Sequence, residues 1–248
     1  MSVDPSLART ALLLGEGAVE AFGRARVAIA GLGAVGAAVA ESLARSGVRR
    51  FWLADFDEIR ESNLNRHPFA FRSTVGLAKT DAAARFLRDI RPDAEIDARP
   101  LFLDAATCRA WLEETRPDVL VDAIDSLLPK TELLLAAEAA GVPFALSCMG
   151  AARKTDPTRF RVSPLDETRI CPLARLVRKR LHRRGGGHGV WAVWSDEEPG
   201  PAPDEPPEEG DLVERGRRRP PMGSLHACTA AAAAVASATV VRWLSAGK

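Results

Sequence analysis

The stretch that decides the fold is "RVAIAGLGAVGAAVAESLARSGVRRFWLADFD", residues 26–57. It has the pattern of a strand, a glycine turn, a helix and a second strand that ends in an acid. Gly31 permits the tight turn, Gly33 lets backbone amides approach a phosphate, and Gly36 lets the helix pack on the strand. Asp55 follows about 20 residues later, where a carboxylate binds ribose hydroxyls. The stretch predicts a nucleotide site; the alternative is a glycine turn without a ligand.

The segments around this unit alternate between helix and strand patterns. Predicted helices cover residues 6–22, 80–91, 105–115, 130–140 and 172–184. Predicted strands cover residues 94–98, 118–124, 142–148 and 159–163. Strands that alternate with helices of this length indicate βαβ units. The predicted fold is therefore α/β: a doubly wound, Rossmann-like, largely parallel sheet with helices on both faces and a smaller C-terminal extension.

Changes in composition predict four regions within a single domain over residues 1–248. They are a nucleotide-binding core (24–150), a basic extension (151–198), a flexible insert (199–221) and a C-terminal helix (222–248). The insert is rich in proline, acid and arginine, which is typical of segments without a packed core. The final helix is mostly alanine, so we expect it to pack closely against a neighbour. Its apolar run is shorter than the roughly 20 residues of a membrane span, which is therefore not favoured.

The overall composition is that of a globular chain without a dominant charge. Hydrophobic residues make up 46% of the 248 residues, and the net charge of +1 gives no global attraction to nucleic acid or membranes. The start, "MSVDPSLARTALLLGEG", lacks the basic region and continuous apolar core of a signal peptide, so a cytoplasmic protein is expected. The four cysteines form no C-x-x-C pair, which argues against structural zinc and disulfides.

The residues after the second strand favour a polyphosphate over a nicotinamide cofactor. They read "DFDEIRESNLNRHPFAFRSTVGLAK", residues 55–79. Arg66 offers a bidentate fork and Lys79 a point charge to phosphate oxygens, and Asn63 can orient them. Asp125 follows a predicted strand at the ligand edge of the sheet, where one carboxylate with phosphate can hold Mg²⁺. Singly, these residues could be surface ion pairs or a helix cap; together they predict a site for ATP and Mg²⁺.

Four motifs carry a resemblance to a known superfamily: "GLGAVG" (31–36), "ADFDEIRESNLNR" (54–66), "VGLAK" (75–79) and "DAIDS" (122–126). Together they resemble the adenylating domain of the ubiquitin-activating superfamily, which includes ThiF and MoeB. Two further stretches, "SCMGAARKTDPTRFRV" and "CPLARLVRKRL", resemble its branch of tRNA threonylcarbamoyladenosine dehydratases. The N-terminal "RTALLLGEGAVEAF" fits the same branch. The resemblance implies one ThiF-type adenylating domain.

The resemblance also implies roles for individual residues. The turn with Gly31, Gly33 and Gly36 faces ATP, and Asp55 lies on its ribose, with Asp57 in the same site. Asn63, Arg66 and Lys79 contact phosphates, and Asp125 serves the metal. Arg9 resembles an arginine that, in some relatives, reaches ATP across the interface of a homodimer.

The activity implied by the resemblance is an ATP-driven loss of water. The threonyl carboxylate of threonylcarbamoyladenosine, beside the tRNA anticodon, is adenylated and then closed into a ring, with release of AMP and pyrophosphate. The implied partners are tRNA, a second copy of the chain and optionally a sulfur-transfer protein. The basic stretch 169–184 contains no acid, so it is either a solvated helix face or a contact for tRNA phosphates.

Three other interpretations remain open at this point. The chain could adenylate the C-terminus of a small carrier protein for sulfur transfer, or it could bind nucleotide without chemistry. A hydride-transferring dehydrogenase is the least favoured, because nothing supplies a nicotinamide site. Two departures from the family pattern bear on the second alternative: Ala34 stands where a glycine is usual, and Cys171 stands where an aspartate is usual.

Overall fold

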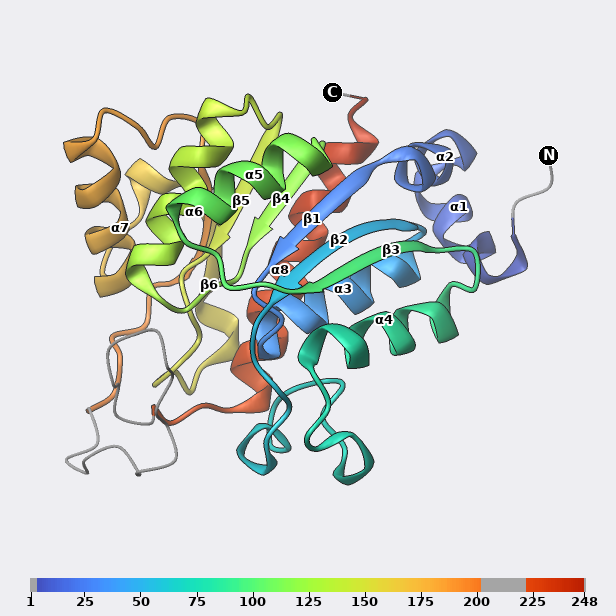
Figure 1. Ribbon diagram of the computed structural model, residues 1–248, viewed down its shortest axis with the longest axis horizontal. Helices are drawn as coiled ribbons and strands as arrows, with labels where there is room; N and C mark the ends of the chain where they lie inside the picture. The colour runs from blue at the N-terminus through green and yellow to red at the C-terminus, as the bar shows by residue number, and fades with distance from the viewer. Residues whose placement is uncertain (1–3, 202–221, 248) are drawn as a thin grey trace.

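The computed structural model describes residues 4–201 and 222–247, so most of the predicted insert, residues 202–221, lies outside the described part. Within that part, one seven-stranded sheet has the order β3-β2-β1-β4-β5-β7-β6 (Figure 1). The strands are β1 (Arg26–Ala30), β2 (Arg50–Asp55), β3 (Glu95–Pro100), β4 (Val119–Asp122), β5 (Phe144–Cys148), β6 (Phe160–Pro164) and β7 (Trp191–Ser195). All pairings are parallel except that of β6 with β7. The predicted doubly wound fold is confirmed.

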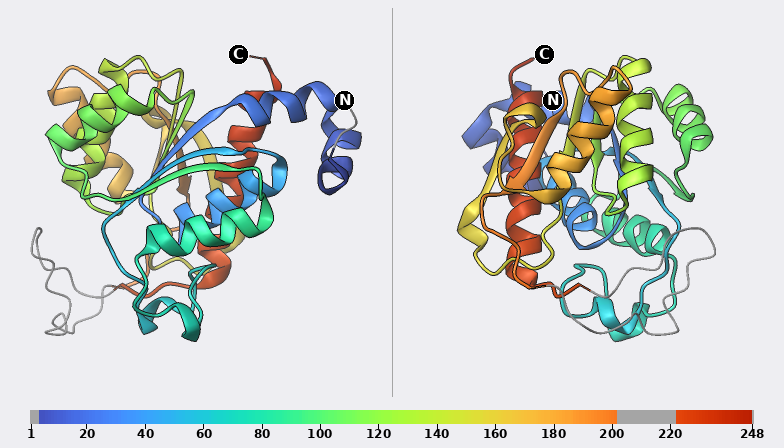
Figure 2. Two further views of the ribbon diagram at one scale, coloured as in Figure 1. Left: turned by 45° about the vertical axis from the view of Figure 1, so that its right-hand side comes forward. Right: turned by 90° about the vertical axis from the view of Figure 1, so that its left-hand side faces the viewer.

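Helices cover both faces of this sheet, as Figure 2 shows. One face carries α3 (Ala34–Ser46), α4 (Lys79–Ile90) and α8 (His226–Ser245). The other carries α5 (Ala105–Thr115), α6 (Leu127–Ala139) and α7 (Pro172–Arg183). Because both faces are covered, the central strands β1 and β4 are buried almost throughout and have continuous apolar sequences.

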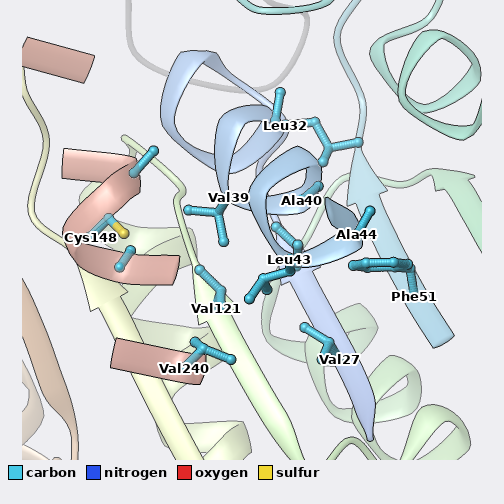
Figure 3. Close-up of a cluster of buried hydrophobic side chains, with 14 of the residues drawn as sticks. Val27, Leu32, Val39, Ala40, Leu43, Ala44, Phe51, Val121, Cys148 and Val240 are labelled. Atoms are coloured by element: carbon cyan, nitrogen blue, oxygen red, sulfur yellow. The ribbon is translucent and has the colours of Figure 1, made fainter. Parts of the chain in front are cut away.

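The largest core cluster lies between the sheet, α3 and α8 (Figure 3). Alanines on α8, among them Ala232 and Ala236, are buried there, and Ser237 Oγ lies 2.9 Å from Ser42 Oγ of α3. This close packing of small side chains is the one expected from the sequence. By length and composition α8 could also cross a membrane, but 50% of its most apolar window is buried inside the molecule.

Two elements differ from the sequence prediction. The single helix predicted over residues 6–22 is wrong: the structure has α1 (Ala8–Leu14) and α2 (Glu16–Arg24), because Gly15 between them adopts φ 87°. Strand β7 was not predicted, although it inserts between β5 and β6 and joins them into the same sheet. Four of its five residues are buried, so it lacks the alternation of apolar and polar residues that marks a half-exposed strand.

Candidate functional site

The glycine turn between β1 and α3 forms an anion cradle at the carboxyl edge of the sheet. Gly31 has φ 85°, and a Cβ there would lie 2.9 Å from the Ala123 carbonyl; a Cβ at Gly36 would overlap the Gly31 carbonyl oxygen. At Gly33, by contrast, a Cβ would meet no atom within 4 Å. Among the described residues, no side chain caps the start of α3. The free amides of this helix start therefore face open space of the kind a phosphate occupies.

Asp55 ends β2 beside this turn, and its carboxylate is nearly buried. Its Oδ2 accepts a 2.6 Å hydrogen bond from the Leu32 N–H, and its Oδ1 accepts one of 2.8 Å from the Asp57 N–H. Burial raises the pKa of the Asp55 carboxyl, and the charge of Lys79 opposes this shift. Asp55 thus fixes the turn and keeps acceptor capacity for a ribose hydroxyl, since each carboxylate oxygen has two lone pairs.

A long loop, residues 56–78, runs from β2 to α4 and carries the predicted phosphate ligands. Arg66 is half-buried, and its Nη1 donates to the Ser62 carbonyl oxygen at 2.9 Å and to Asn65 Oδ1 at 2.8 Å. Burial lowers the pKa of the Arg66 guanidinium. Asn63 Oδ1 accepts from the Arg60 N–H at 3.1 Å. Local contacts therefore shape this loop and leave guanidinium nitrogens of Arg66 available to an anion.

Lys79 begins α4, directly after this loop. Its ammonium is nearly buried and lies 2.7 Å from Asp57 Oδ2. The backbone N–H of Lys79 also donates to the Asp57 carbonyl oxygen, at 3.0 Å. Asp57 thus positions Lys79 and shares its charge. A buried ammonium with one carboxylate partner retains two N–H donors for phosphate oxygens.

His67, which the sequence analysis did not single out, joins the loop to the glycine turn. Its Nδ1 accepts from the Phe69 N–H at 3.1 Å, so Nε2 carries the proton and donates to the Leu32 carbonyl oxygen at 2.7 Å. Its pKa is lowered to about 4, mainly by burial; the Leu32 bond opposes this shift, and the charges of Lys79 and Arg66 add to it. His67 therefore stays neutral, and its bond to Leu32 holds the segment that carries Arg66 against the glycine turn. Only its position next to Arg66 hinted at this role.

The end of β4 lies against the glycine turn and carries Asp125. The Ala123 N–H donates to the Ala30 carbonyl oxygen at 2.8 Å, which joins the two turns. Asp125 follows on the exposed surface at the carboxyl edge, just before α6. This is the edge where open α/β sheets bind ligands, so a carboxylate here can meet a metal that also binds phosphate.

A buried ion pair of Asp122 and Lys130, which the sequence analysis missed, lies at the end of β4, just before Asp125. Lys130 Nζ lies 2.7 Å from Asp122 Oδ2, 3.1 Å from Ser147 Oγ and 3.0 Å from the Cys148 carbonyl oxygen. All three ammonium donors are thus used, and the Ile124 N–H donates to Asp122 Oδ1 at 3.1 Å. The pair holds the turn that carries Asp125. The motif "DAIDS" contains Asp122 as well as Asp125, but nothing in it indicates that Lys130 is the partner of Asp122.

Arg9 lies away from the rest of the predicted site. It is exposed on α1, and the preceding Leu7 packs near Gly47 at the far end of α3. Since α3 has 13 residues, its two ends are about 20 Å apart. Arg9 therefore does not reach the glycine turn of its own chain.

The described residues contain no group of three or more histidines, cysteines, aspartates or glutamates arranged to hold a metal. A metal at this edge would need oxygen ligands from a bound phosphate besides Asp125, as is usual for Mg²⁺. The four cysteines are buried free thiols, and burial raises the pKa of Cys108 and Cys148 to about 12.

Comparison with known proteins identifies the family of the chain. The profile of the ThiF family matches residues 7–247. A tRNA threonylcarbamoyladenosine dehydratase of Bacillus subtilis is 37% identical over 191 residues, which cover 77% of this chain and 74% of the relative. The Escherichia coli enzyme is 34% identical over 69% of this chain and 63% of its own length.

Solved structures give the same result at the level of the fold. The crystal structure of Escherichia coli tRNA N6-threonylcarbamoyladenosine dehydratase, TcdA, in complex with ATP superposes with a TM-score of 0.85 and 28% sequence identity, over 100% of this chain and 98% of that one. The same enzyme in complex with AMP also gives a TM-score of 0.85. The chain described here belongs to the ThiF family.

Proposed function

We propose that this chain is an ATP-dependent dehydratase of threonylcarbamoyladenosine in tRNA. The observation that carries the proposal is an uncapped helix start to which His67 ties the loop of Arg66, and Asp55 and Asp57 tie Lys79, in a fold that superposes on an ATP complex of TcdA. Two cations beside free backbone amides suit a polyphosphate. A tRNA substrate also implies a cytoplasmic location.

The proposed reaction has two steps. A carboxylate oxygen of the threonyl group attacks the α-phosphate of ATP, the bond to the β-phosphate breaks, and pyrophosphate leaves. A nitrogen of the same side chain then attacks the activated carbonyl carbon, closes the ring and expels AMP, with its proton passing to solvent. The net change is the loss of one water from the nucleoside.

The residues of the site contribute mainly position and charge. Arg66 and Lys79 stabilise the negative charge that develops on the phosphates, and the amides at Gly33 and the start of α3 orient them. Asp55 holds the ribose. A carboxylate is already ionised at neutral pH, so the first step requires no general base.

We further propose that Asp125 holds Mg²⁺ together with the phosphates of ATP. Its exposure at the carboxyl edge, beside the glycine turn, fits a metal that takes few protein ligands. When bound, Mg²⁺ would neutralise phosphate charge. Asp122 and Lys130 would keep Asp125 in place.

A homodimer is part of the same proposal. Leu12 and Leu13 on α1 are 88% and 81% exposed, beside the exposed Arg9. Such side chains favour burial against a partner. A second copy that covers α1 could bring Arg9 to the nucleotide of its neighbour.

Adenylation of a carrier protein is the second candidate. It has support from the molybdopterin-synthase adenylyltransferase of Escherichia coli, which is 36% identical over 50% of this chain. The phosphate site described above would serve that reaction equally, and a sulfur-transfer protein could then be a partner. The substrate, rather than the site, distinguishes the two functions.

The test is turnover of ATP with tRNA from cells that lack the dehydratase, followed by mass analysis of the nucleosides. We expect release of AMP and pyrophosphate and loss of one water from threonylcarbamoyladenosine. The reaction should vanish in Arg66→Ala and Asp125→Ala and persist in Arg72→Ala, an exposed arginine of the same loop. Pyrophosphate exchange without a tRNA product would favour carrier-protein adenylation, and no ATP chemistry with either partner would leave a binding protein.

A further inference from the structure

An open pocket of about 460 Å³ lies at the start of α7, outside the nucleotide site. Three arginines line it, Arg169, Arg175 and Arg178, with Glu198 as the single acid in its wall. The pocket is therefore positive by two charges, since three arginines face one glutamate. The net charge of the whole chain is only +1, so this charge is concentrated locally.

The pocket opens at the same edge of the sheet as the glycine turn. Cys171 Sγ lies 3.9 Å from the carbonyl oxygen of Met149, which directly follows β5, and Glu198 follows β7. Both strands run parallel to β1 and end at the carboxyl edge. Because β4 alone separates β5 from β1, the two strands are about 10 Å apart. One extended ligand could reach both sites.

The three arginines differ in what they contact. Arg178 Nη1 donates to Thr168 Oγ1 at 2.6 Å and to the carbonyl oxygens of Leu165 and Thr168 at 3.1 Å, which fixes the rim of the pocket. Arg169 and Arg175 are exposed, and their side chains have no hydrogen bond or ion pair within residues 4–201 and 222–247. Their guanidinium groups are thus free to bind an anion in bidentate fashion.

The start of α7 adds further donors to this wall. Cys171 occupies the N-cap, and no side chain of the described residues caps the helix. Pro172, the first residue of the helix, has no N–H, so the amides of Leu173 and Ala174 are the ones available, at the positive end of the helix dipole. A bound anion would satisfy these amides and both arginines together.

An apolar side chain at the rim favours a nucleic acid over a free ion. Ile170 has φ 62°, unusual for a β-branched residue, and its side chain is 54% exposed between Arg169 and Cys171. A sugar or base next to a bound phosphate could pack on this surface. An inorganic phosphate could not use it.

We propose that this pocket binds a backbone phosphate of the tRNA anticodon arm while the modified nucleoside reaches ATP at the glycine turn. The inference rests on the proposed function and adds a defined anchor for the RNA. Arg169, Arg175 and the amides of α7 hold the phosphate, and Arg178 positions the loop that carries Arg169.

The test measures binding of a synthetic anticodon stem-loop to the full chain over a range of KCl concentrations. In the double variant Arg169→Ala/Arg175→Ala we expect about tenfold weaker binding near physiological salt, and a slope of log K against log salt reduced by about one. The affinity for ATP should not change. Since both side chains are exposed, the variant should unfold at the wild-type temperature, which thermal denaturation checks.

The matched control is Arg180→Ala/Arg183→Ala, which removes the same charge from exposed positions of the same helix outside the pocket. Equal weakening in the two double variants would show that α7 acts as a diffuse cationic face and would overturn the pocket. Loss of inorganic phosphate binding with an unchanged stem-loop affinity would also overturn it, in favour of a free-ion site. Binding does not require turnover, so a wild-type protein that binds the stem-loop without dehydrating tRNA would refute only the proposed function.

Discussion

At the scale of the residue, the site is stabilised by charged and polar groups that do not themselves face solvent. Asp122 and Lys130 are wholly buried, and every ammonium donor of Lys130 has a partner. Such a pair adds little net stability, because desolvation offsets the attraction. Its value lies in geometry: Asp122 also accepts from the Ile124 N–H, one residue before Asp125.

Removal of one partner should therefore be costly. In Lys130→Met the carboxylate of Asp122 stays buried without its cation, and we expect the free energy of unfolding to fall by about 3–5 kcal/mol. Adding Asp122→Asn removes the unpaired charge and should restore part of the loss. Urea unfolding of the two variants measures both effects. An equal stability of Lys130→Met and the wild type would contradict the importance of this pair.

His67 predicts how stability depends on pH. The folded pKa of about 4 lies below the ordinary value of 6.5, so the unfolded chain takes up a proton first as the pH falls. The free energy of unfolding should therefore decrease between pH 6.5 and 4, by about 3 kcal/mol in total. The variant His67→Gln has no such titration. The difference between its free energy of unfolding and that of the wild type should therefore shrink as the pH falls from 6.5 to 4. A difference that stays constant with pH would contradict the prediction.

At the scale of the element, α8 closes the core only because its inner face is small. Ala236 is fully buried, whereas Ala234 on the same helix is exposed. Ala236→Leu should lower the free energy of unfolding by about 1–3 kcal/mol through overpacking, and Ala234→Leu should leave it nearly unchanged. Thermal unfolding distinguishes the two variants. Similar effects at both positions would mean that α8 is not closely packed.

The same scale shows what the sequence could predict. Helix α5 was predicted with its observed bounds and α7 within one residue, because the capping residue Asp104 marks the start of the first and Pro172 the start of the second. The break at Gly15 needed the glycine to adopt positive φ, and a tertiary arrangement decides that. Strand β7 is buried on both sides, so periodicity could not identify it.

The candidate site could likewise be predicted only in part from the sequence. Glycines and acids that follow strands occupy fixed places in a doubly wound sheet, so spacing alone could predict that Gly31, Gly33 and Asp55 lie together. The contacts of His67 and Lys130 could not, because each joins segments that only the fold brings together. His67 bonds a carbonyl 35 residues away, and Lys130 bonds one 18 residues away.

At the scale of the whole molecule, the glycine turn lies at the start of α3, whereas Leu7, directly before α1, packs near Gly47 at the other end of that helix. Asp4, just before α1, pairs with Arg91 at the end of α4, at 3.1 Å, which fixes the N-terminal segment at that end. The proposed role of Arg9 at ATP therefore requires another copy of the chain. A two-fold dimer would place two such arginines at two sites.

Mixed dimers test this arrangement. Arg9→Ala and Lys79→Ala should each abolish adenylation alone, since each removes a phosphate contact from both sites. In a mixed dimer, one site combines Lys79 of the first chain with Arg9 of the second and stays intact, while the other site loses both. An equal mixture that reassorts at random should thus regain about a quarter of wild-type activity. If α1 forms the interface, the double variant Leu12→Glu/Leu13→Glu should also be inactive, because its chains cannot pair. If Arg9 instead acted within its own chain, every site of the mixture would lack one residue and the mixture would stay inactive.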